Sequence, residues 1–327
     1  MPKNKPINLV ESDLVNRHVL IEVTKGCNLN CRHCFTAAGN KMKNELDIAE
    51  WKLAIKDLND SGFNAFTLSG GEPLLEKEKV FGLAKEIKRL NNRAKVYLFT
   101  NCKLVNREVA RRIKKIFDGV MVSLDGDKKT HNWLRRNKKS YDDVIAALTI
   151  FQEIGVPVSL QSMITDKNIN YFKKLVKIAE KYSVIAIRFS QVDLFGRARE
   201  FKNDLKPNNE LLAKLDRKIK KMSENSKVFL TSNLISRKKL MDRPEKYRQP
   251  SLHILANGSI LPWYGFTKKY ELLKYPKERF GKMTLKEITN KLKLFNKLLD
   301  KAEKNAKILK NDILAYDNII AGYLFNK

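Results

Sequence analysis

The stretch HVLIEVTKGCNLNCRHC, residues 18–34, joins a short apolar run to three of the four cysteines in the chain. Residues 18–23 predict a buried β-strand, because they are mostly apolar and include β-branched side chains. The cysteines follow with the spacing C-x3-C-x2-C, which cannot place all three thiols on one face of a helix. This spacing indicates a loop around a metal or redox centre and not a disulfide framework.

The next two hundred or so residues alternate short apolar runs with longer helical patterns. Strands are predicted within 18–23, 63–73, 95–101, 119–126, 156–164 and 184–192, and helices at 48–62, 80–92, 107–117, 141–155, 169–183 and 209–224. Repeated strand–helix units imply an α/β fold with parallel strands and right-handed crossovers. The pattern is compatible with an open doubly wound sheet or with a partial barrel.

Unusual residues gather at the carboxyl ends of the predicted strands. The cysteines follow the first strand, GGEP (70–73) follows the second, Asn101 and Cys102 follow the third, and Ser123 and Asp125 lie at the fourth. In (β/α) barrels the chemistry is located at this end of the strands. The coincidence therefore predicts an active site there.

The chemistry of the cysteine cluster depends on its metal. Three converging thiolates need a metal to neutralise them. A structural zinc would need a fourth ligand, for which His33 or His18 is available, but no second separated pair of ligands follows. A [4Fe–4S] cluster usually takes four cysteines, so three would leave one iron open. The residues alone leave both metals as alternatives.

Charge and hydropathy limit the partners. The 327 residues include 65 Lys and Arg against 36 Asp and Glu, a formal net charge of +29. Such charge attracts acidic peptides, nucleic acid or anionic lipid, but the lysines are spread along every segment. We expect a generally basic surface first, an acidic peptide or protein partner second and nucleic acid last. No apolar run approaches ~20 residues, and no signal peptide is recognisable, which predicts a cytoplasmic protein.

Taken together, these motifs resemble the radical S-adenosylmethionine (SAM) superfamily. CNLNCRHC (27–34) is similar to its CxxxCxxC loop, and SGGEP (69–73) to its GGEP motif. TNC (100–102) stands where relatives have TNG or TNC. VSLDG (122–126) with His131 and Arg135, and FGRARE (195–200), are similar to the SPASM/twitch branch, which includes peptide-modifying maturases. The resemblance implies a partial (β/α)6 TIM-type barrel over residues 18–224. An N-terminal segment (1–17) would precede it and a small α+β extension (225–327) would follow.

The resemblance also implies roles for individual residues. Cys27, Cys31 and Cys34 would hold one [4Fe–4S] cluster, with SAM on the fourth iron. The expected SAM contacts are His33 near the adenine, Gly70, Gly71 and Glu72 at the ammonium, Pro73 fixing the turn, Ser123 and Asp125 at the cofactor, and Arg135 at the carboxylate. Arg136 competes with Arg135, and Ser123 and Asp125 could instead cap the next element. His131 is expected to be structural.

The fourth cysteine has two interpretations. Cys102 either fills a position where relatives have Gly, or donates a hydrogen atom to a substrate radical as a catalytic residue.

The C-terminal part resembles a SPASM/twitch extension without its cysteines. ILANGSILPW (254–263) is similar to the hairpin of that extension, with Trp263 where a cluster ligand would stand. GKMTLKEI (281–288) is similar to the segment after it, and a helical tail is expected from Leu285. Asn257-Gly258 predicts a type I′ turn. We therefore expect a degenerate extension that binds no auxiliary cluster.

The resemblance implies reductive cleavage of SAM, driven by a reductant such as flavodoxin or ferredoxin. The 5′-deoxyadenosyl radical would abstract hydrogen from a peptide or protein, for epimerisation or cross-linking. One alternative is a radical SAM enzyme of cofactor biosynthesis, of small molecules, or of nucleoside or tRNA modification. An alternative of another class is a non-catalytic iron–sulfur or zinc protein.

Overall fold

The computed structural model describes residues 18–60, 62–194, 196–205, 208–234, 251–258 and 260–261. The N-terminal segment 1–17, Trp263, the segment 281–288 and the expected helical tail lie outside these residues.

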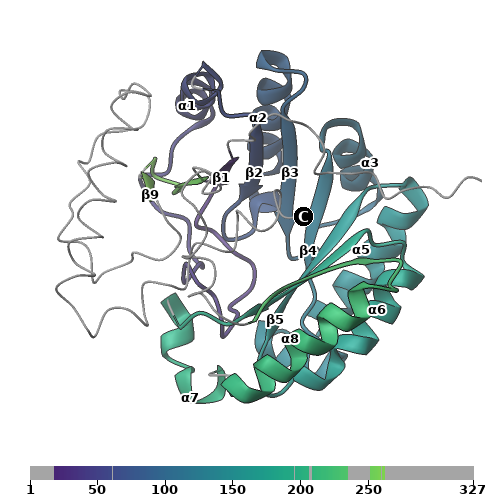
Figure 1. Cartoon of the computed structure of the whole chain (residues 1–327). Coiled ribbons are helices and arrows are strands. Elements are labelled where there is room, and N and C mark those ends of the chain that lie inside the picture. The colour runs from purple at the N-terminus through teal and green to yellow at the C-terminus, as the bar shows by residue number, and fades with distance from the viewer. Residues whose placement is uncertain are drawn as a thin grey trace, which may run out of the picture.

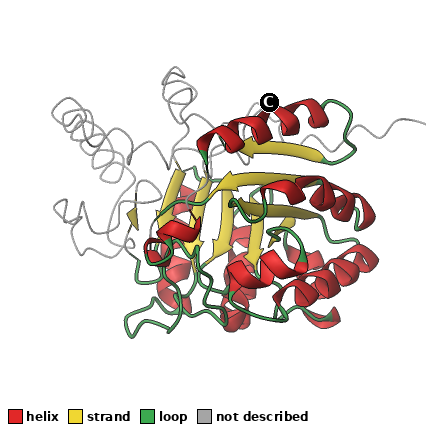
Figure 2. Cartoon of the chain, turned by 90° about the horizontal axis from the view of Figure 1, so that it is seen from below, coloured by secondary structure: helices red, strands yellow, loops and turns green. Residues whose placement is uncertain are grey.

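All six predicted strands are present and pair in parallel in chain order. They are β1 (His18–Glu22), β2 (Ala65–Ser69), β3 (Lys95–Thr100), β4 (Gly119–Ser123), β5 (Val158–Ile164) and β6 (Ala186–Gln191). The sheet is curved and helices cover its outer side (Figures 1 and 2). This arrangement confirms the predicted α/β partial barrel.

The helices of the repeated units also follow the prediction. They are α1 (Ile48–Asp60), α2 (Lys77–Leu90), α3 (Arg107–Ile116), α5 (Ser140–Ile154), α6 (Phe172–Lys181) and α8 (Asn209–Ser223). Local signals set their ends: the Asn106 side chain accepts a hydrogen bond from Val109 N at the start of α3, and Gly155 ends α5 in a left-handed conformation (φ 73°).

Several short helices join these units. They are α4 (Lys128–Arg135), α7 (Lys202–Leu205) and the 3₁₀ helices η1 (Pro73–Glu76), η2 (Ile169–Tyr171) and η3 (Gly196–Arg199). The apolar pattern does not predict α4, because its sequence KKTHNWLR is mostly polar. Its start is instead marked by Asp127, whose carboxylate accepts from Thr130 N at 2.9 Å.

The sheet extends beyond the six predicted strands. Strand β7 (Phe229–Asn233) pairs in parallel with β6, and β8 (Ser251–Ile254) pairs in parallel with β1. The predicted hairpin forms between β8 and β9 (Ile260–Leu261), and its first strand extends the barrel sheet. Strand β7 escapes prediction because its sequence FLTSN is more polar than apolar. The division of the chain at residue 224 stays a prediction.

The hairpin turn differs from the type I′ turn that Asn257-Gly258 predicts. Gly258 N donates to Leu255 O at 2.8 Å, and Gly258 has a φ of 80°. The φ angle of Asn257 is not positive. A type I turn followed by a left-handed glycine fits these values, and type I′ does not.

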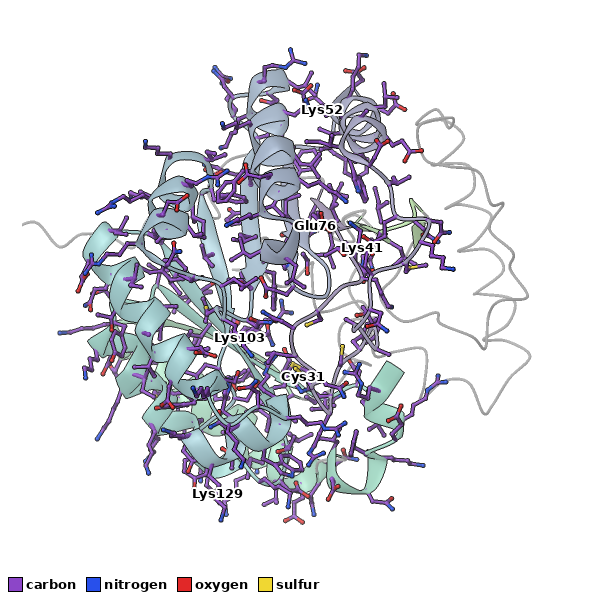
Figure 3. The ribbon with its side chains drawn as sticks, turned by 180° about the vertical axis from the view of Figure 1, so that it is seen from behind. Cys31, Lys41, Lys52, Glu76, Lys103 and Lys129 are labelled. Carbon is purple, nitrogen blue, oxygen red and sulfur yellow. The ribbon has the colours of Figure 1, made fainter. Side chains whose placement is uncertain are left out.

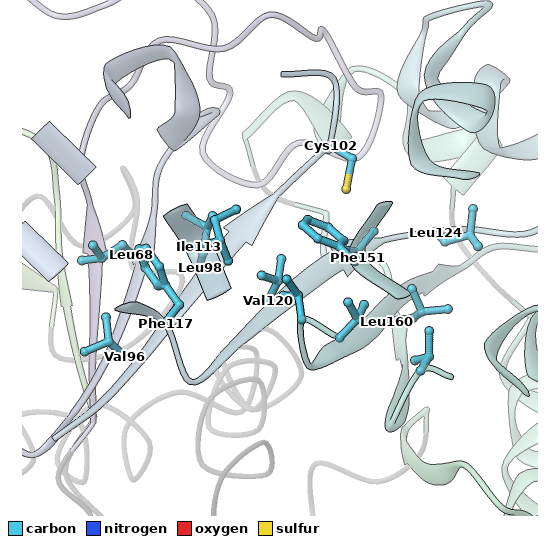
Figure 4. Packing of buried hydrophobic residues seen from close by; sticks show 14 of the residues in the cluster. Leu68, Val96, Leu98, Cys102, Ile113, Phe117, Val120, Leu124, Phe151 and Leu160 are labelled. Carbon is cyan, nitrogen blue, oxygen red and sulfur yellow. The ribbon is translucent and has the colours of Figure 1, made fainter. Parts of the chain in front are cut away.

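Alternate residues of each strand divide the interior into two parts. In β2, Thr67 and Ser69 line a cavity inside the curved sheet, whereas Phe66 and Leu68 belong to the apolar core beneath the helices. Phe151 of α5 is fully buried in this core, in the same cluster as Val120 and Leu160 (Figure 4). The helices therefore seal the outer face of the sheet, and the inner face is left for a site.

Basic side chains are distributed over the surface, as the sequence predicts. Lys52, Lys103 and Lys129 lie on different sides of the molecule in Figure 3. Some lysines are paired, such as Lys41 with Glu76 at 2.5 Å. Within the described ranges, no helix is both long and apolar enough to cross a membrane.

Replacing Phe151 with Ala should destabilise the fold by about 3–5 kcal/mol, because it leaves a cavity in a closely packed core. Urea unfolding of the reduced apoprotein measures this free energy. Leu53→Ala is the matched control, since Leu53 is 60% exposed and should change stability by less than about 0.5 kcal/mol. A loss below about 1 kcal/mol for Phe151→Ala would contradict the assigned core.

Candidate active site

The three clustered cysteines lie on a loop that follows β1. The loop is closed at its neck, where Gly26 and Gly39 form an isolated bridge, Cys27 N donates to Gly39 O at 2.7 Å, and Gly39 N donates to Lys25 O at 3.2 Å. Because the neck is closed, the intervening residues curl over the carboxyl ends of the strands. Figure 3 shows Cys31 near the centre of the molecule.

A cavity of about 1450 Å³ extends from this loop into the interior of the barrel. Of the predicted site residues, those that line it are Cys27, Cys31, Cys34, His33, Gly70, Gly71, Ser123 and Arg135. Pockets for one small ligand usually measure about 300–1,000 Å³. This cavity therefore has room for a cofactor and a substrate together.

The thiols are held in a way that suits a cluster of several irons. Leu29 N approaches the Cys27 sulfur at 3.4 Å, and Ala38 N approaches the Cys34 sulfur at 3.3 Å. Burial, and then the neighbouring thiols, raise the pKa of Cys27 to about 12. Burial also raises the pKa of Cys31, against the charge of Arg135. Bound metal would be needed to ionise them.

The donor set bears on the choice between the two metals. The three thiols of Cys27, Cys31 and Cys34 line one cavity. A zinc site requires all its sulfurs about 2.3 Å from one ion, whereas an iron–sulfur cluster holds each thiolate on its own iron. The donor set fits a cluster. His18, the other suggested zinc ligand, lies at the opposite end of β1 and is bonded to Thr67 at 2.9 Å.

The two glycines after β2 press against the chain that leads into the cysteine loop. Gly71 N donates to Thr24 O, and Glu72 N donates to Gly26 O, both at 2.8 Å. A Cβ on Gly70 would lie 2.4 Å from Thr24 O, and one on Gly71 would lie 2.2 Å from Gly26 O. Only glycine fits at these two positions. This close packing against the chain before Cys27 is a reason for the two glycines that the sequence did not reveal.

Glu72 is fully buried and does not line the cavity. Its carboxylate accepts hydrogen bonds from Leu74 N at 3.1 Å, Thr100 Oγ1 at 2.9 Å and Asn101 N at 2.8 Å. Pro73 is likewise buried and outside the cavity lining. The Glu72 carboxylate thus joins the ends of β2 and β3 through hydrogen bonds. Its predicted contact with SAM stays a prediction.

A hydrogen bond that sequence reasoning missed links the end of β3 to the cysteine loop. Asn101 Nδ2 donates to Asn28 Oδ1 at 2.8 Å. Asn28 is the residue directly after Cys27, so the end of β3 contacts the loop itself. The only signal in the sequence is that Asn101 stands at the carboxyl end of a strand.

Asp125 orients the side chain of Arg135 through a hydrogen-bonded ion pair. The guanidinium Nε donates to Asp125 Oδ2 at 2.6 Å, and its Nη1 lies 4.0 Å from the Cys31 sulfur. Met163 N donates to the other carboxylate oxygen at 2.9 Å. Burial opposes ionisation of Asp125, but the charge of Arg135 outweighs it and holds the pKa well below its ordinary value. Asp125 is fully buried behind the cavity, and Arg136 is exposed and does not line it.

His131 and Asn168 complete the support of Asp125. Asp125 N donates to His131 Nδ1 at 3.1 Å, so the ring proton is on Nε2, which faces Ser140 Oγ at 3.0 Å. The ring is neutral, since burial lowers its pKa, and its 3.4 Å approach to the Asp125 carboxylate is not an ion pair. Asn168 Nδ2 donates to Asp125 O at 2.5 Å. This network fixes Arg135 toward the cavity.

His33 and Ser123 line the cavity from different elements, the cysteine loop and the end of β4. Burial, and then the charge of Arg135, lower the pKa of His33 to about 3, so its ring is neutral. Its buried Nδ1 has no hydrogen-bond partner among the described residues. Ser123 lies at the end of β4 and is 4% exposed. Both side chains are placed to contact a ligand in the cavity.

Cys102 is not brought together with the other site residues. It is buried in the apolar core, in the same cluster as Phe151 and Leu124 (Figure 4), and does not line the cavity. Its φ of 69° is left-handed, which suits the interpretation that it stands where glycine is usual. Burial raises the pKa of this thiol well above its ordinary value.

Comparison with known proteins places the chain in a family. A model of the Radical SAM superfamily matches residues 21–179. The chain is 30% identical over 205 residues to Fe-coproporphyrin III synthase of Methanosarcina barkeri, covering 62% of this chain and 51% of that protein. It is 31% identical over 212 residues to the uncharacterized protein MJ0907 of Methanocaldococcus jannaschii, covering 62% and 72%.

A maturation protein and a solved structure are also similar to this chain. The sporulation killing factor maturation protein SkfB of Bacillus subtilis is 25% identical over 187 residues, covering 55% of this chain and 43% of SkfB. SuiB of Streptococcus suis bound to S-adenosylmethionine has a TM-score of 0.67 at 18% identity, covering 83% of this chain and 65% of SuiB. The chain spans about half the length of several curated relatives. It belongs to the radical SAM superfamily, whose members use a [4Fe–4S] cluster and SAM.

Replacing Glu72 with Gln should change how stability depends on pH. Burial raises the pKa of Glu72 from 4.5 to about 7, and the three hydrogen bonds to its carboxylate limit the rise. The folded protein therefore holds this proton more tightly than the unfolded chain, and stability falls as the pH rises from 4.5 through 7. The free energy of unfolding of the wild type minus that of Glu72→Gln should fall by up to about 3 kcal/mol.

Urea unfolding of the reduced apoprotein between about pH 4.5 and 8 measures this difference. Glu78→Gln is the control, because the Glu78 side chain is 74% exposed and should alter the dependence little. A difference that stays flat or rises with pH would show that Glu72 is ionised throughout.

Proposed function

We propose that this protein holds one [4Fe–4S] cluster through Cys27, Cys31 and Cys34 and cleaves SAM reductively. The observation that carries the proposal is that the cysteine loop, Gly70, Gly71, Ser123 and Arg135 converge on one cavity at the carboxyl ends of the strands. When bound, the cluster would supply the electron for this cleavage, drawn from a flavodoxin- or ferredoxin-type donor.

The chain's own residues supply binding and orientation. Three thiolates leave one iron open, and Arg135, held by Asp125, presents a fixed charge toward the cavity for a carboxylate. Ser123 offers a hydroxyl and His33 an unpaired ring nitrogen, Nδ1, for the polar edges of the cofactor. Gly70 and Gly71 also line the cavity. The enclosing strands exclude water from a reactive species.

Anaerobic reconstitution tests this function. The wild type should bind about four irons per chain and, with dithionite, should form 5′-deoxyadenosine from SAM. Cys31→Ala should lose both properties, because it removes a ligand. The matched control Cys102→Ala should keep both, since Cys102 is buried away from the cavity.

Each other outcome points to a different alternative. Zinc without SAM cleavage would support a non-catalytic metal protein. About eight irons per chain would require a second cluster and would contradict the single-cluster proposal.

For the substrate, we propose a carboxylated tetrapyrrole-type cofactor precursor. Tyr97, Phe99 and Met121 line the cavity and offer apolar surface, against which a large conjugated ring would be buried. At the end of the cavity away from the cysteines, Lys227 would pair with a carboxylate, whereas Lys95 is already paired with Asp118 at 3.2 Å. The 30% identity to an Fe-coproporphyrin III synthase supports the same class.

A peptide or protein substrate is the second candidate. It is supported by the formal net charge of +29, which suits an acidic peptide, and by the likeness to SkfB, a maturation protein.

Substrate-stimulated SAM cleavage separates the two classes. Fe-coproporphyrin III, added to the reconstituted protein, should shift the absorption of the porphyrin on binding and raise 5′-deoxyadenosine formation roughly tenfold or more, since remote binding energy is used to position the reacting carbon. A porphyrin that neither binds nor stimulates would rule out this class. Stimulation by an acidic peptide encoded beside the gene would instead support maturation.

A further inference from the structure

A segment far from the cysteines in sequence packs directly on their loop. The 3₁₀ helix η3 begins at Gly196, just after β6, and Arg197 N donates to Cys34 O at 2.9 Å. Gly196 has a φ of 51°, and a Cβ there would lie 2.1 Å from Phe35 O. The backbone of η3 therefore touches the loop more closely than any other residue type at position 196 would allow.

The Arg197 side chain joins two further points of the same loop. Its Nη1 donates to Cys31 O at 3.0 Å and its Nη2 donates to Ala38 O at 2.5 Å. Both nitrogens belong to one rigid planar group, so the separation of these two carbonyls is set by the guanidinium. With the bond to Cys34 O, one residue contacts the loop at three places between residues 31 and 38.

These contacts differ from the others that hold the loop. The bridge between Gly26 and Gly39 closes the neck, and Arg32 N is bonded to Leu134 O at 2.8 Å. Arg197 instead spans the part that carries Cys31 and Cys34. Its guanidinium, bonded to Cys31 O and Ala38 O, brings a positive charge to this part of the loop.

We propose that Arg197 is a positioning residue for the iron–sulfur cluster. The two Nη nitrogens of its planar guanidinium fix the separation of the Cys31 and Ala38 carbonyls, and so the shape of the loop that carries Cys31 and Cys34. Its permanent positive charge favours the reduced form of the cluster. A cluster that gains an electron becomes more negative, so a nearby cation stabilises it and raises its reduction potential. This inference rests on the proposed function, since it presupposes the cluster.

The two parts of the role are separable by substitution. Arg197→Lys keeps the charge but removes the planar guanidinium, and Arg197→Gln removes both. Arg199→Gln is the matched control, because it removes the same charge from the same short helix at an exposed position. Circular dichroism of each apoprotein establishes that it is folded before reconstitution.

Two measurements without SAM read out the effect. Iron release to an excess of chelator should be about 10–100-fold faster for Arg197→Gln and Arg197→Lys, as expected when an outer partner of a metal site is lost. The midpoint potential, from redox titration followed by electron paramagnetic resonance, should become more negative for Arg197→Gln and stay near that of the wild type for Arg197→Lys. Arg199→Gln should match the wild type in both.

Wild-type rates of iron release in both Arg197 variants would overturn the positioning role. An unchanged potential in Arg197→Gln would overturn the electrostatic role. If Arg197→Gln does not fold, Arg197→Lys decides alone: faster release supports positioning and an unchanged rate refutes it. A wild type that binds no cluster would instead overturn the proposed function, and this role with it.

Discussion

The close contact between the glycine turn after β2 and the chain before Cys27 is the constraint on which the site depends. Two backbone hydrogen bonds of 2.8 Å join Gly71 and Glu72 to Thr24 and Gly26. The buried Glu72 carboxylate then ties the same turn to the end of β3. Three consecutive strand ends and the cysteine loop thus form one connected unit, and a side chain at Gly71 would separate them.

The buried Asp125–Arg135 pair orients a side chain, whereas the glycine turn joins strand ends. A buried ion pair often adds nothing to stability compared with apolar residues of similar size, because both charges lose their hydration. Here Asp125 also accepts from Met163 N, and the surrounding His131 is neutral. We infer that this arrangement keeps a guanidinium at a fixed position beside Cys31, which an apolar replacement would not do.

Much of this architecture could be predicted, because parallel strands that are buried on both faces leave apolar runs in the sequence, and motifs at their ends share one edge. Strand β7 could not, since its polar sequence becomes a strand only through pairing with β6. The buried positions of Glu72 and Asp125 also depend on contacts from other strands. Motif resemblance suggests a residue's role but not whether its side chain faces the cavity. Cys102 shows this, because it lies just beyond the end of β3 and its side chain belongs to the apolar core.

The charge balance of the cysteine loop connects these observations. Burial raises the pKa of Cys27 and Cys31, so a buried loop of thiolates requires compensating positive charge. Arg135 provides one cation from α4, after β4, and Arg197 provides another from η3, after β6. Both reach the loop only when the later strands of the barrel have paired. The first motif of the chain is therefore completed by segments more than a hundred residues away, and we expect retention of a cluster to depend on folding of the barrel through β6.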